Sequence, residues 1–301
     1  MDILITGGTT FVSKCMAEYF VARGDSVFVL NRNTKPQPNG VTLIQADRNA
    51  LGGALKNKRF DAVIDVNAYN ASYVNGLLDA LDGFDRYILI SSSAVYPETA
   101  KQPFKEDTPV GANKFWGAYG LGKIQAEQAL AARVADAHII RPPYIYGKYN
   151  NVYREAFVFD CALANRPFYV PNDGSMKLQF FDVRDLCRFA DILLSSSPAH
   201  RVFNVGGAPV SILDFVKYCY SAAGKDLDAV YVTNCAEQRD YFPFYDYEYE
   251  LDVSEMRYLM PDITPLEQGF AYAFKQYVKD RTCVKAKNYI KYIDDNLARR
   301  A

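Results

Sequence analysis

Short apolar runs rich in β-branched residues alternate with helix-length segments through the first half of the chain, and this alternation restricts the fold most. Expected strands lie at 3–6, 26–30, 41–46, 62–66, 86–90 and 138–141, and expected helices at 12–23, 72–81 and 114–134. Strands that are apolar throughout and separated by helices are typical of a parallel sheet covered on both faces. We therefore expect an α/β protein with a doubly wound parallel sheet.

The composition is that of an ordinary globular protein, with 301 residues of which 50% are hydrophobic and 23% charged. Thirty-four basic and 35 acidic residues nearly cancel, so the net charge of −1 offers no general attraction to nucleic acid or membranes. Six scattered cysteines and two separate histidines predict neither a disulfide framework nor a metal site. Because no apolar run looks like a signal peptide or a bilayer span, we expect a cytoplasmic protein.

A glycine-containing stretch, Thr6–Ser13, lies where the first expected strand turns into the first expected helix. Glycines at such a turn let the backbone approach a pyrophosphate, which binds the free N–H groups of the helix N-terminus. Thr10 and Ser13 replace the second and third glycines of a full fingerprint, but both are small enough for tight helix–strand contact. The stretch predicts a dinucleotide site, with a purely structural turn as the alternative.

The residues that follow the second and third expected strands are expected to recognise the adenosine half of a dinucleotide. NAD is usually recognised by an acidic side chain after the second strand, where this chain has Asn31 and Arg32. A guanidinium suits the 2′-phosphate of NADP, so we favour NADP over NAD, unless Arg32 is only a solvated surface residue. Asp47 and Arg48 follow the third strand and are expected to contact the adenine edge or to open a turn.

Tyr119 and Lys123 lie four residues apart, which places both side chains on one face of an expected helix. A phenol ordinarily loses its proton near pH 10, but a neighbouring ammonium lowers that pKa and makes the phenol a usable proton donor and acceptor. Tyr144 and Lys148 have the same spacing, but neighbouring prolines and a glycine disfavour a helix there. We therefore assign the acid–base role to Tyr119.

Three serines, Ser91–Ser93, follow the strand expected at 86–90. They lie at the carboxyl edge of the sheet, where open α/β sheets bind their ligands. A hydroxyl at this edge can hydrogen-bond a substrate oxygen while Tyr119 moves its proton. Serine triplets also occur in plain loops, so the catalytic interpretation depends on their combination with Tyr119 and Lys123.

Taken in order, these motifs resemble the extended short-chain dehydrogenase/reductase superfamily, in its NAD-dependent epimerase/dehydratase branch. The collinear blocks are Thr6–Ser13, Asp61–Tyr69, Ser91–Tyr96, Tyr119–Lys123, Arg141–Gly147, Phe180–Leu186 and Phe203–Gly207. The resemblance implies a Rossmann-type sheet domain that holds the cofactor and a smaller, discontinuous C-terminal subdomain that binds the substrate. The implied ranges are 1–150, about 178–200 and about 240–257 for the first, and about 151–177, 201–239 and 258–301 for the second.

The resemblance also implies site residues and a reaction. The implied catalytic set is Ser92, Tyr119 and Lys123, in which Lys123 also holds the nicotinamide ribose. The residues expected at the dinucleotide are Gly7, Thr9, Thr10, Phe11, Val12, Asn31, Arg32, Asp47, Arg48, Asn67, Tyr119, Lys123 and Arg141. Those expected at a sugar-like substrate are Ser93, Asn151, Lys177, Gln179 and Arg239. The implied reaction is hydride transfer between nicotinamide and a carbon of a sugar or nucleotide sugar, by an epimerase or a reductase.

Departures from the family pattern narrow this expectation. Ser93 and Ala94 stand where 4,6-dehydratases carry an Asp-Glu pair, which argues against dehydration. Leu178 stands where many nucleotide-sugar epimerases carry an arginine, so Lys177 and Arg239 are the alternative phosphate clamps, unless they are only surface charges. The start of the chain also resembles a subgroup with plastid RNA-binding members, so the alternative is a non-catalytic, dinucleotide-sensing or RNA-binding protein. The family is also consistent with a homodimer.

Overall fold

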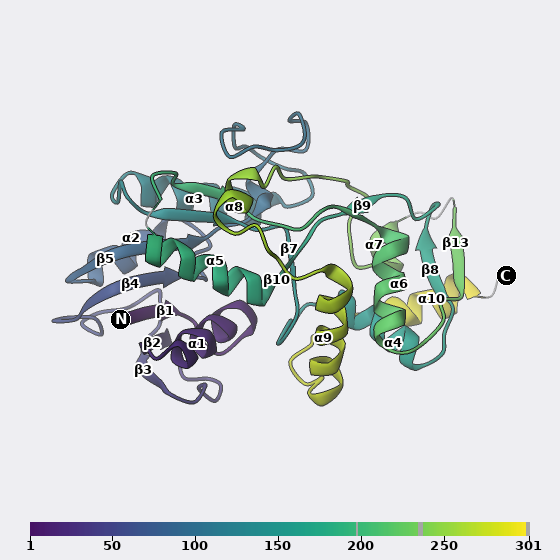
Figure 1. Cartoon of the computed structure of the whole chain (residues 1–301), viewed down its shortest axis with the longest axis horizontal. Helices are drawn as coiled ribbons and strands as arrows, with labels where there is room; N and C mark the ends of the chain where they lie inside the picture. Colours follow the sequence, from purple (N-terminus) through teal and green to yellow (C-terminus); the bar gives the residue numbers. More distant parts are fainter. Residues whose placement is uncertain (197, 234–236, 299–301) are drawn as a thin grey trace. The chain divides into compact units, whose positions relative to one another are not determined.

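The computed structural model describes residues 1–196, 198–233 and 237–298, which fall into two compact units (Figure 1). Unit 1 comprises Met1–Pro143, Val183–Gly206 and Leu251–Ile263. Unit 2 is smaller and comprises Tyr144–Asp182, Gly207–Glu250 and Thr264–Ala301. Residues 197, 234–236 (with Cys235) and 299–301, which fall within the domain ranges expected from the sequence, lie outside the described residues.

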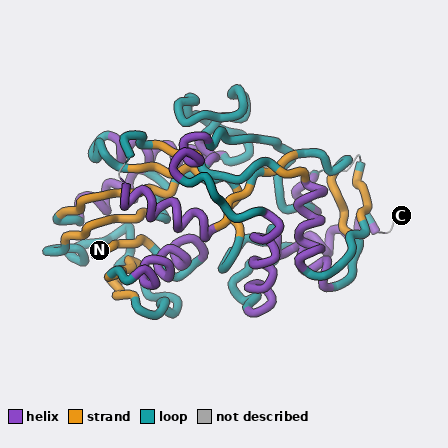
Figure 2. The backbone as a smooth tube through the Cα atoms, viewed as in Figure 1, coloured by secondary structure: helices purple, strands orange, loops and turns teal. Residues whose placement is uncertain are grey.

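Among the described residues, unit 1 contains a seven-stranded sheet whose neighbouring strands all run parallel. Figure 2 shows the strands in orange. Its strands are β1 (Asp2–Thr6), β2 (Ser26–Asn31), β3 (Val41–Gln45), β4 (Arg59–Asp65), β5 (Gly83–Ile90), β6 (His138–Arg141) and β11 (Val202–Asn204), in the order β11-β6-β5-β4-β1-β2-β3. The chain moves outward from β1 to β3 and then returns as β4 on the other side of β1. This reversal is a topological switch point, where such sheets bind ligands at their carboxyl ends. The expected doubly wound, Rossmann-type sheet is confirmed.

Helices cover both faces of this sheet (Figure 1). The helices of unit 1 are α1 (Phe11–Arg23), α2 (Ala71–Ala80), η1 (Ser93–Val95), α3 (Gly117–Ala131), α5 (Val183–Ser196) and α8 (Ser254–Leu259). α1 packs beside α5, and α2 packs beside α3. Because the crossovers after β1 and after β4 run in opposite directions and are right-handed, these two layers lie on opposite faces. Leu4 and Val63 from the strands pack with Leu77 and Leu130 from the α2–α3 layer.

Helices and short strand pairs build unit 2. The described helices are α4 (Glu155–Leu163), α6 (Ile212–Ala222), α7 (Gln238–Tyr241), α9 (Leu266–Lys279) and α10 (Tyr289–Asn296). The strand pairs are β7 (Tyr144–Tyr146) with β10 (Phe180–Asp182), β8 (Phe168–Pro171) with β13 (Ala229–Val232), and β9 (Lys177–Leu178) with β12 (Val210–Ser211). Across the described part of the chain, no helix has the length and apolarity that a bilayer crossing needs.

Aromatic rings form the core of unit 2. The ring of Phe180 stacks on Phe215 at 5.0 Å and meets Phe244 and Phe270 edge-on at 5.7 and 5.5 Å. Phe244 belongs to the aromatic tract 241–249, in which most rings are buried. The tract therefore serves mainly to pack the core, because large rings bury much apolar area.

The helix expected over 114–134 spans only Gly117–Ala131. Asn113 makes the difference, because its side-chain oxygen accepts the N–H of Phe115 at 2.9 Å and its carbonyl oxygen accepts the N–H of Gly117 at 2.9 Å. Gly117 has a φ of +47°, which turns the chain before the helix begins. Tyr119 consequently lies in the first turn of α3.

Glycines let α3 approach two loop backbones closely. A Cβ atom on Gly120 would overlap the carbonyl oxygen of Ala94, and one on Gly122 would overlap the carbonyl oxygen of Tyr69. These two loops follow β5 and β4, so α3 rests directly on the carboxyl edge of the sheet. The Tyr-x-x-x-Lys pattern thus includes two small residues that the packing requires.

Gly122→Ala should lower the free energy of unfolding by about 1–3 kcal/mol, because the added methyl group meets a backbone oxygen that cannot move away as a flexible side chain would. Gly76→Ala in α2 is the matched control, because nothing lies within 4 Å of its Cβ position. Alanine is the better helix former, so this control should gain about 0.5–1 kcal/mol. Urea unfolding followed by circular dichroism measures both. An unchanged stability of Gly122→Ala would contradict the tight contact.

Candidate active site

The turn after β1 has the geometry of a phosphate-binding loop. Gly7 and Gly8 have φ values of +94° and +95°, which favour glycine, and a Cβ atom on Gly8 would overlap the side chain of Val29. Ser13, in the place of the third glycine, donates to the carbonyl oxygen of Thr10 at 2.9 Å. The Oγ of Ser13 lies only 2.8 Å from the Cβ position of Gly7, so Gly7 and a small residue at position 13 are both needed for this close contact.

The first turn of α1 leaves its backbone N–H groups available to an anion. Thr10 is the N-cap residue, but its side chain makes no capping hydrogen bond in the described structure. Thr9, Phe11 and Val12 are half-buried around it, and the first turn contains no acidic residue. Such a helix end carries a partial positive charge. The Nζ atom of Lys35, which our sequence analysis did not single out, adds a cation 3.4 Å from Thr10 Oγ1.

Asn31 holds the glycine turn in place. Its Nδ2 donates to the carbonyl oxygen of Gly7 at 2.7 Å. Its Oδ1 accepts the N–H of Asn33 at 2.8 Å and the Nε2 of Gln37 at 3.2 Å. The side chain is thus engaged with neighbouring protein groups, and it leaves no carboxylate at the end of β2.

Arg32 and Asp47 come from the loops after β2 and β3. Hydrogen bonds from Asn49 lower the pKa of the Asp47 carboxyl, and the Arg32 guanidinium lowers it further. Arg32 is exposed, and Lys35 follows it on the same loop. This corner of the sheet therefore combines one carboxylate with two cations.

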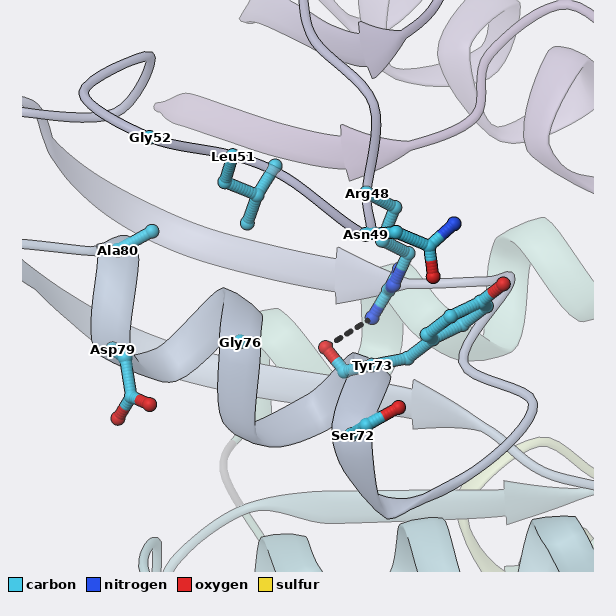
Figure 3. A pocket seen from close by; sticks show the side chains of 9 residues that line it. All are labelled: Arg48, Asn49, Leu51, Gly52, Ser72, Tyr73, Gly76, Asp79 and Ala80. Atoms are coloured by element: carbon cyan, nitrogen blue, oxygen red, sulfur yellow. Dashed lines mark hydrogen bonds between the residues drawn. The ribbon is translucent and has the colours of Figure 1, made fainter.

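Arg48 points into the interior of unit 1. Its two Nη atoms donate to the buried carboxylate of Asp65, Nη1 at 2.6 Å, and Nη1 also donates to Oδ1 of Asn67 at 2.6 Å. Nη2 donates to the carbonyl oxygen of Tyr73 at 3.1 Å, as Figure 3 shows. The adenine contact expected from the sequence would therefore have to use the flat face of the guanidinium, since its Nη donors are engaged.

A cavity of about 310 Å³ opens beside Arg48, between the loop after β3 and α2 (Figure 3). It is lined by Arg48, Asn49, Leu51, Gly52, Ser72, Tyr73, Gly76, Asp79 and Ala80. Its size falls within the roughly 300–1,000 Å³ of small-molecule pockets. Its lining combines the planar groups of Arg48 and Tyr73 with apolar and polar side chains.

Tyr119 and Lys123 both meet the ring of Tyr69. The ring centroids of Tyr69 and Tyr119 lie 6.4 Å apart, and the Nζ atom of Lys123 lies 5.4 Å from the Tyr69 centroid. Lys123 is 2% exposed and donates to the carbonyl oxygen of Ile90 at 2.8 Å, whereas Tyr119 is 43% exposed. The structure therefore brings a fixed, buried ammonium and an accessible phenol to one side of α3.

Burial lowers the pKa of Lys123 to about 8. Asp65 and Glu127 act in the opposite direction, and Arg48 adds to the decrease. Each of these carboxylates is itself paired with an arginine, so neither neutralises the ammonium directly. Lys123 can therefore change its protonation state not far from neutral pH.

The three serines after β5 have different environments. Ser91 is buried and donates its hydroxyl to Glu127. Ser93 is also buried, in η1. Ser92 is half-buried, and its Oγ accepts the N–H of Ala94 at 3.2 Å, which leaves its own proton to donate. Ser92 is thus the most accessible hydroxyl of the three.

Arg141 lies in a second buried ion pair. Its Nε and Nη2 donate to Glu127 at 3.0 and 2.6 Å. Its Nη1 donates to the hydroxyl of Tyr96 at 2.8 Å and to the carbonyl oxygen of Glu106 at 3.0 Å. The guanidinium expected at the cofactor is thus engaged with α3 and with the segment after β5.

The residues expected at the substrate in unit 2 lie in different settings. Lys177 is exposed, and its backbone N–H donates to Glu248 at 2.7 Å. Gln179 is buried, and its side chain donates to a backbone carbonyl oxygen at 2.9 Å. The carbonyl oxygen of Asn151 accepts the N–H of Lys285 at 3.1 Å, which joins the loop before α4 to the segment before α10. Arg239 lies in α7, which packs against α10.

Three cations of unit 2, namely Arg154, Arg239 and Lys287, form a cluster that the sequence did not reveal. The guanidinium of Arg154 lies 4.8 Å from the ring centroid of Tyr144, and the Nζ of Lys287 lies 5.9 Å from that of Tyr289. Burial lowers the pKa of Lys287, and Arg239 and Arg154 lower it further. In the described structure none of the three forms an ion pair. Nor do described His, Cys, Asp and Glu side chains gather in threes as metal ligands would.

Residues 3–206 match the NAD dependent epimerase/dehydratase family. The chain belongs to this family. The match covers the glycine turn, the Asp65–Arg48 pair, the serines and α3, and it ends at Gly206, where the second segment of unit 1 also ends. Membership places the chain among enzymes of an NAD-dependent family.

Curated relatives and solved structures are similar to this chain over most of its length. The chloroplast stem-loop binding protein of 41 kDa b from Arabidopsis thaliana is 28% identical over 282 residues, covering 86% of this chain and 74% of the relative. A UDP-glucose 4-epimerase from Corynebacterium glutamicum is 25% identical over 274 residues, covering 76% of this chain and 82% of the relative. The structure of UDP-glucose 4-epimerase with UDP-glucose from Thermotoga maritima has a TM-score of 0.76 at 18% identity and covers 93% of this chain and 99% of that chain. At that identity it shows the epimerase/dehydratase fold.

The lowered pKa of Lys123 predicts a pH-dependent stability for this member of the family. Below pH 8 the ammonium is charged in both states, so its burial cost is fully present. Between pH 8 and the ordinary value of 10.5 the unfolded chain holds a proton that the folded chain has released, so stability rises with pH. As the pH rises through this window, the free energy of unfolding of the wild type should therefore increase by up to about 3 kcal/mol relative to that of Lys123→Met.

Urea unfolding from pH 7 to pH 10 measures this difference. Lys56→Met removes an exposed lysine and should follow wild type at every pH. Parallel pH dependence of wild type and Lys123→Met would contradict a depressed pKa at Lys123.

Proposed function

We propose that this chain is an NAD(P)-dependent epimerase or reductase that acts on an alcohol or ketone of a sugar or nucleotide sugar, with Tyr119 as the acid–base residue. The observation that carries the proposal is the arrangement on α3. An accessible phenol and a buried ammonium meet the same ring at the carboxyl edge of the sheet. Family membership and the UDP-glucose 4-epimerase relative support the reaction class.

The residues of unit 1 fit a dinucleotide. The Gly7–Gly8 backbone and the uncapped N–H groups of α1 suit its pyrophosphate. The cavity beside Arg48 suits the adenine, because a flat base can stack on its planar groups. Lys123 and Tyr119 would hold the nicotinamide ribose. When bound, the nicotinamide accepts or supplies the hydride.

Tyr119 would take a proton from, or return it to, the substrate oxygen. The side chain of Tyr119 is 43% exposed, and the charge of Lys123 favours the phenolate. Ser92 would donate its free proton to the same oxygen. Ser93 and Ala94 provide no acid–base pair, so the residues support epimerisation or reduction rather than loss of water.

The cation cluster of unit 2 supports a substrate that carries an anionic group. Like charges that approach one another without a carboxylate partner raise the free energy of the cluster, and an anion relieves that repulsion. Arg154, Arg239 and Lys287 would bind such a group, so Arg239 keeps the role expected from the sequence. A phosphorylated sugar or a nucleotide sugar supplies this chemistry.

Tyr119→Phe should reduce turnover at least a thousandfold while dinucleotide affinity and thermal stability stay near wild type, because only the transferable proton is lost. The assay follows nicotinamide absorbance over a panel of sugars, sugar phosphates and nucleotide sugars, with product epimers analysed separately. Tyr258→Phe, which changes an exposed phenol on α8, is the control with unchanged turnover. Undiminished turnover by Tyr119→Phe would refute the assignment.

We also propose that NADP binds more tightly than NAD. Asn31 is engaged with the glycine turn, whereas Arg32 and Lys35 supply two cations at the end of β2. The carboxylate of Asp47 lies near Arg32 and leaves the guanidinium exposed. These observations support a 2′-phosphate rather than a free ribose hydroxyl as the preferred group.

Arg32→Ala should weaken NADPH binding about tenfold and change NADH binding less than twofold, because only NADPH carries the 2′-phosphate. Isothermal titration calorimetry measures both ligands. Arg257→Ala, an exposed arginine on α8, is the control. Mass spectrometry of any dinucleotide that co-purifies gives an independent answer, and equal losses for NADH and NADPH would contradict the preference.

The alternative is a non-catalytic, dinucleotide-sensing or RNA-binding protein on the same fold. The specific observation that favours it is the 28% identity to a relative named for stem-loop binding. A gel-shift with stem-loop RNA at physiological salt separates the two functions when it is run beside the hydride-transfer assay. RNA binding without turnover on any sugar of the panel would favour this alternative.

A further inference from the structure

Asp65, the last residue of β4, is fully buried, yet its carboxylate accepts hydrogen bonds from three side chains. Thr6 Oγ1 donates at 2.8 Å and the Tyr87 hydroxyl at 2.7 Å, and Arg48 donates from both Nη atoms. Burial by itself would raise the pKa of Asp65, but Arg48 and these hydroxyls outweigh it and lower the pKa. Asp65 therefore stays charged and holds Arg48 in a bidentate pair.

The pair leaves Arg48 with one orientation. A planar guanidinium that donates twice to a carboxylate has little rotational freedom. The carbonyl oxygen of Tyr73 accepts a further hydrogen bond, and the guanidinium lies 5.2 Å from the Tyr73 ring centroid. Strands β1, β4 and β5, the loop after β3 and the start of α2 thus meet at the Asp65–Arg48 pair.

Arg48 in turn determines which way the side-chain amide of Asn67 faces. A guanidinium can only donate, so its 2.6 Å contact must be with the amide oxygen of Asn67. The NH₂ group then points away from Arg48, and its nitrogen lies 3.7 Å from the Cβ position of Gly7. The backbone N–H of Asn67 is held as well, at 3.4 Å from Thr6 Oγ1.

We propose that Arg48, held by Asp65, is a positioning residue that keeps the NH₂ group of Asn67 facing the glycine turn, where it donates to an oxygen of the dinucleotide. A reversed amide would present its oxygen to the phosphate or ribose oxygens and replace attraction by repulsion. The inference rests on the proposed function, because it requires a dinucleotide at Gly7. It gives Arg48 an indirect role through Asn67, in addition to the proposed stacking of the adenine on its guanidinium.

A double-mutant cycle tests this coupling through dinucleotide affinity, which calorimetry measures without turnover. Asn67→Ala in the wild-type background should weaken NADPH and NADH binding about tenfold. Arg48→Met combined with Asp65→Asn removes both charges together. The new amide can accept from one of the two hydroxyls, of Thr6 and Tyr87, and donate to the other. In that background Asn67→Ala should weaken binding less than twofold, because the amide is no longer oriented.

A purely structural role predicts a different result, namely the same effect of Asn67→Ala in both backgrounds, and that result would overturn the inference. Tyr87→Phe is the matched control, since it removes one donor to Asp65 but keeps the contact between Arg48 and Asn67. It should lower thermal stability while the dissociation constant changes less than twofold.

Two further outcomes remain distinguishable. If the variant with Arg48→Met and Asp65→Asn does not fold, Arg48→Lys takes its place in the cycle. A lysine retains the positive charge but lacks the planar guanidinium that donates twice to Asp65 and also to Asn67. Failure of the wild-type protein to bind NADPH or NADH would refute the proposed function itself. Binding by wild type that Asn67→Ala leaves unchanged would refute only the inference about Arg48.

Discussion

The close approach of α3 to the carboxyl edge of the sheet is the constraint on which the rest of unit 1 depends. Gly120 and Gly122 let the helix rest on the backbones that follow β5 and β4. This contact carries Tyr119 and Lys123 to the switch-point edge, where doubly wound sheets bind their ligands. A side chain at either glycine would displace both functional groups together. The proton transfer proposed for Tyr119 requires hydrogen-bond reach, so it would depend on these two glycines as well as on the phenol and the ammonium.

Charge inside unit 1 is balanced in pairs around a single buried ammonium. Asp65 pairs with Arg48 between β4 and the loop after β3, and Glu127 pairs with Arg141 between α3 and β6. Each pair is neutral as a whole, so burial dominates the environment of Lys123 and lowers its pKa. Breaking one partner of such a pair would leave an uncompensated buried charge, which is strongly unfavourable. The two ion pairs therefore fix which side chains meet inside unit 1, and they leave burial to lower the pKa of Lys123.

Unit 2 has a different balance of forces. Its core is made of stacked and edge-on aromatic rings, while Arg154, Arg239 and Lys287 gather without a carboxylate in an ion pair among the described residues. The position where many epimerases carry an arginine is Leu178, which is buried. The cations of unit 2 therefore come from other segments, and they would restore the affinity for an anionic group that the sequence pattern had put in doubt.

Local patterns in the sequence determined the sheet, the glycine turn and the order of the motifs. The alternation of apolar runs and helical segments is a short-range property, and it predicted the doubly wound sheet and the bounds of most of its strands to within about three residues. The spacing of Tyr119 and Lys123 likewise follows from helix geometry. The start of α3 differs from the prediction, because Asn113 forms a turn that delays the helix to Gly117. Hydrophobic periodicity does not reveal such a turn.

Tertiary structure alone decided where the polar side chains point. Arg48 turns inward because Asp65, far along the chain, offers a buried carboxylate, and Arg141 turns to Glu127 for the same reason. Asn31 turns to the backbone of Gly7. The sequence places each of these residues at the correct edge of the sheet, but the direction of a long polar side chain depends on which distant partner satisfies its hydrogen bonds, and only the folded chain brings those partners together.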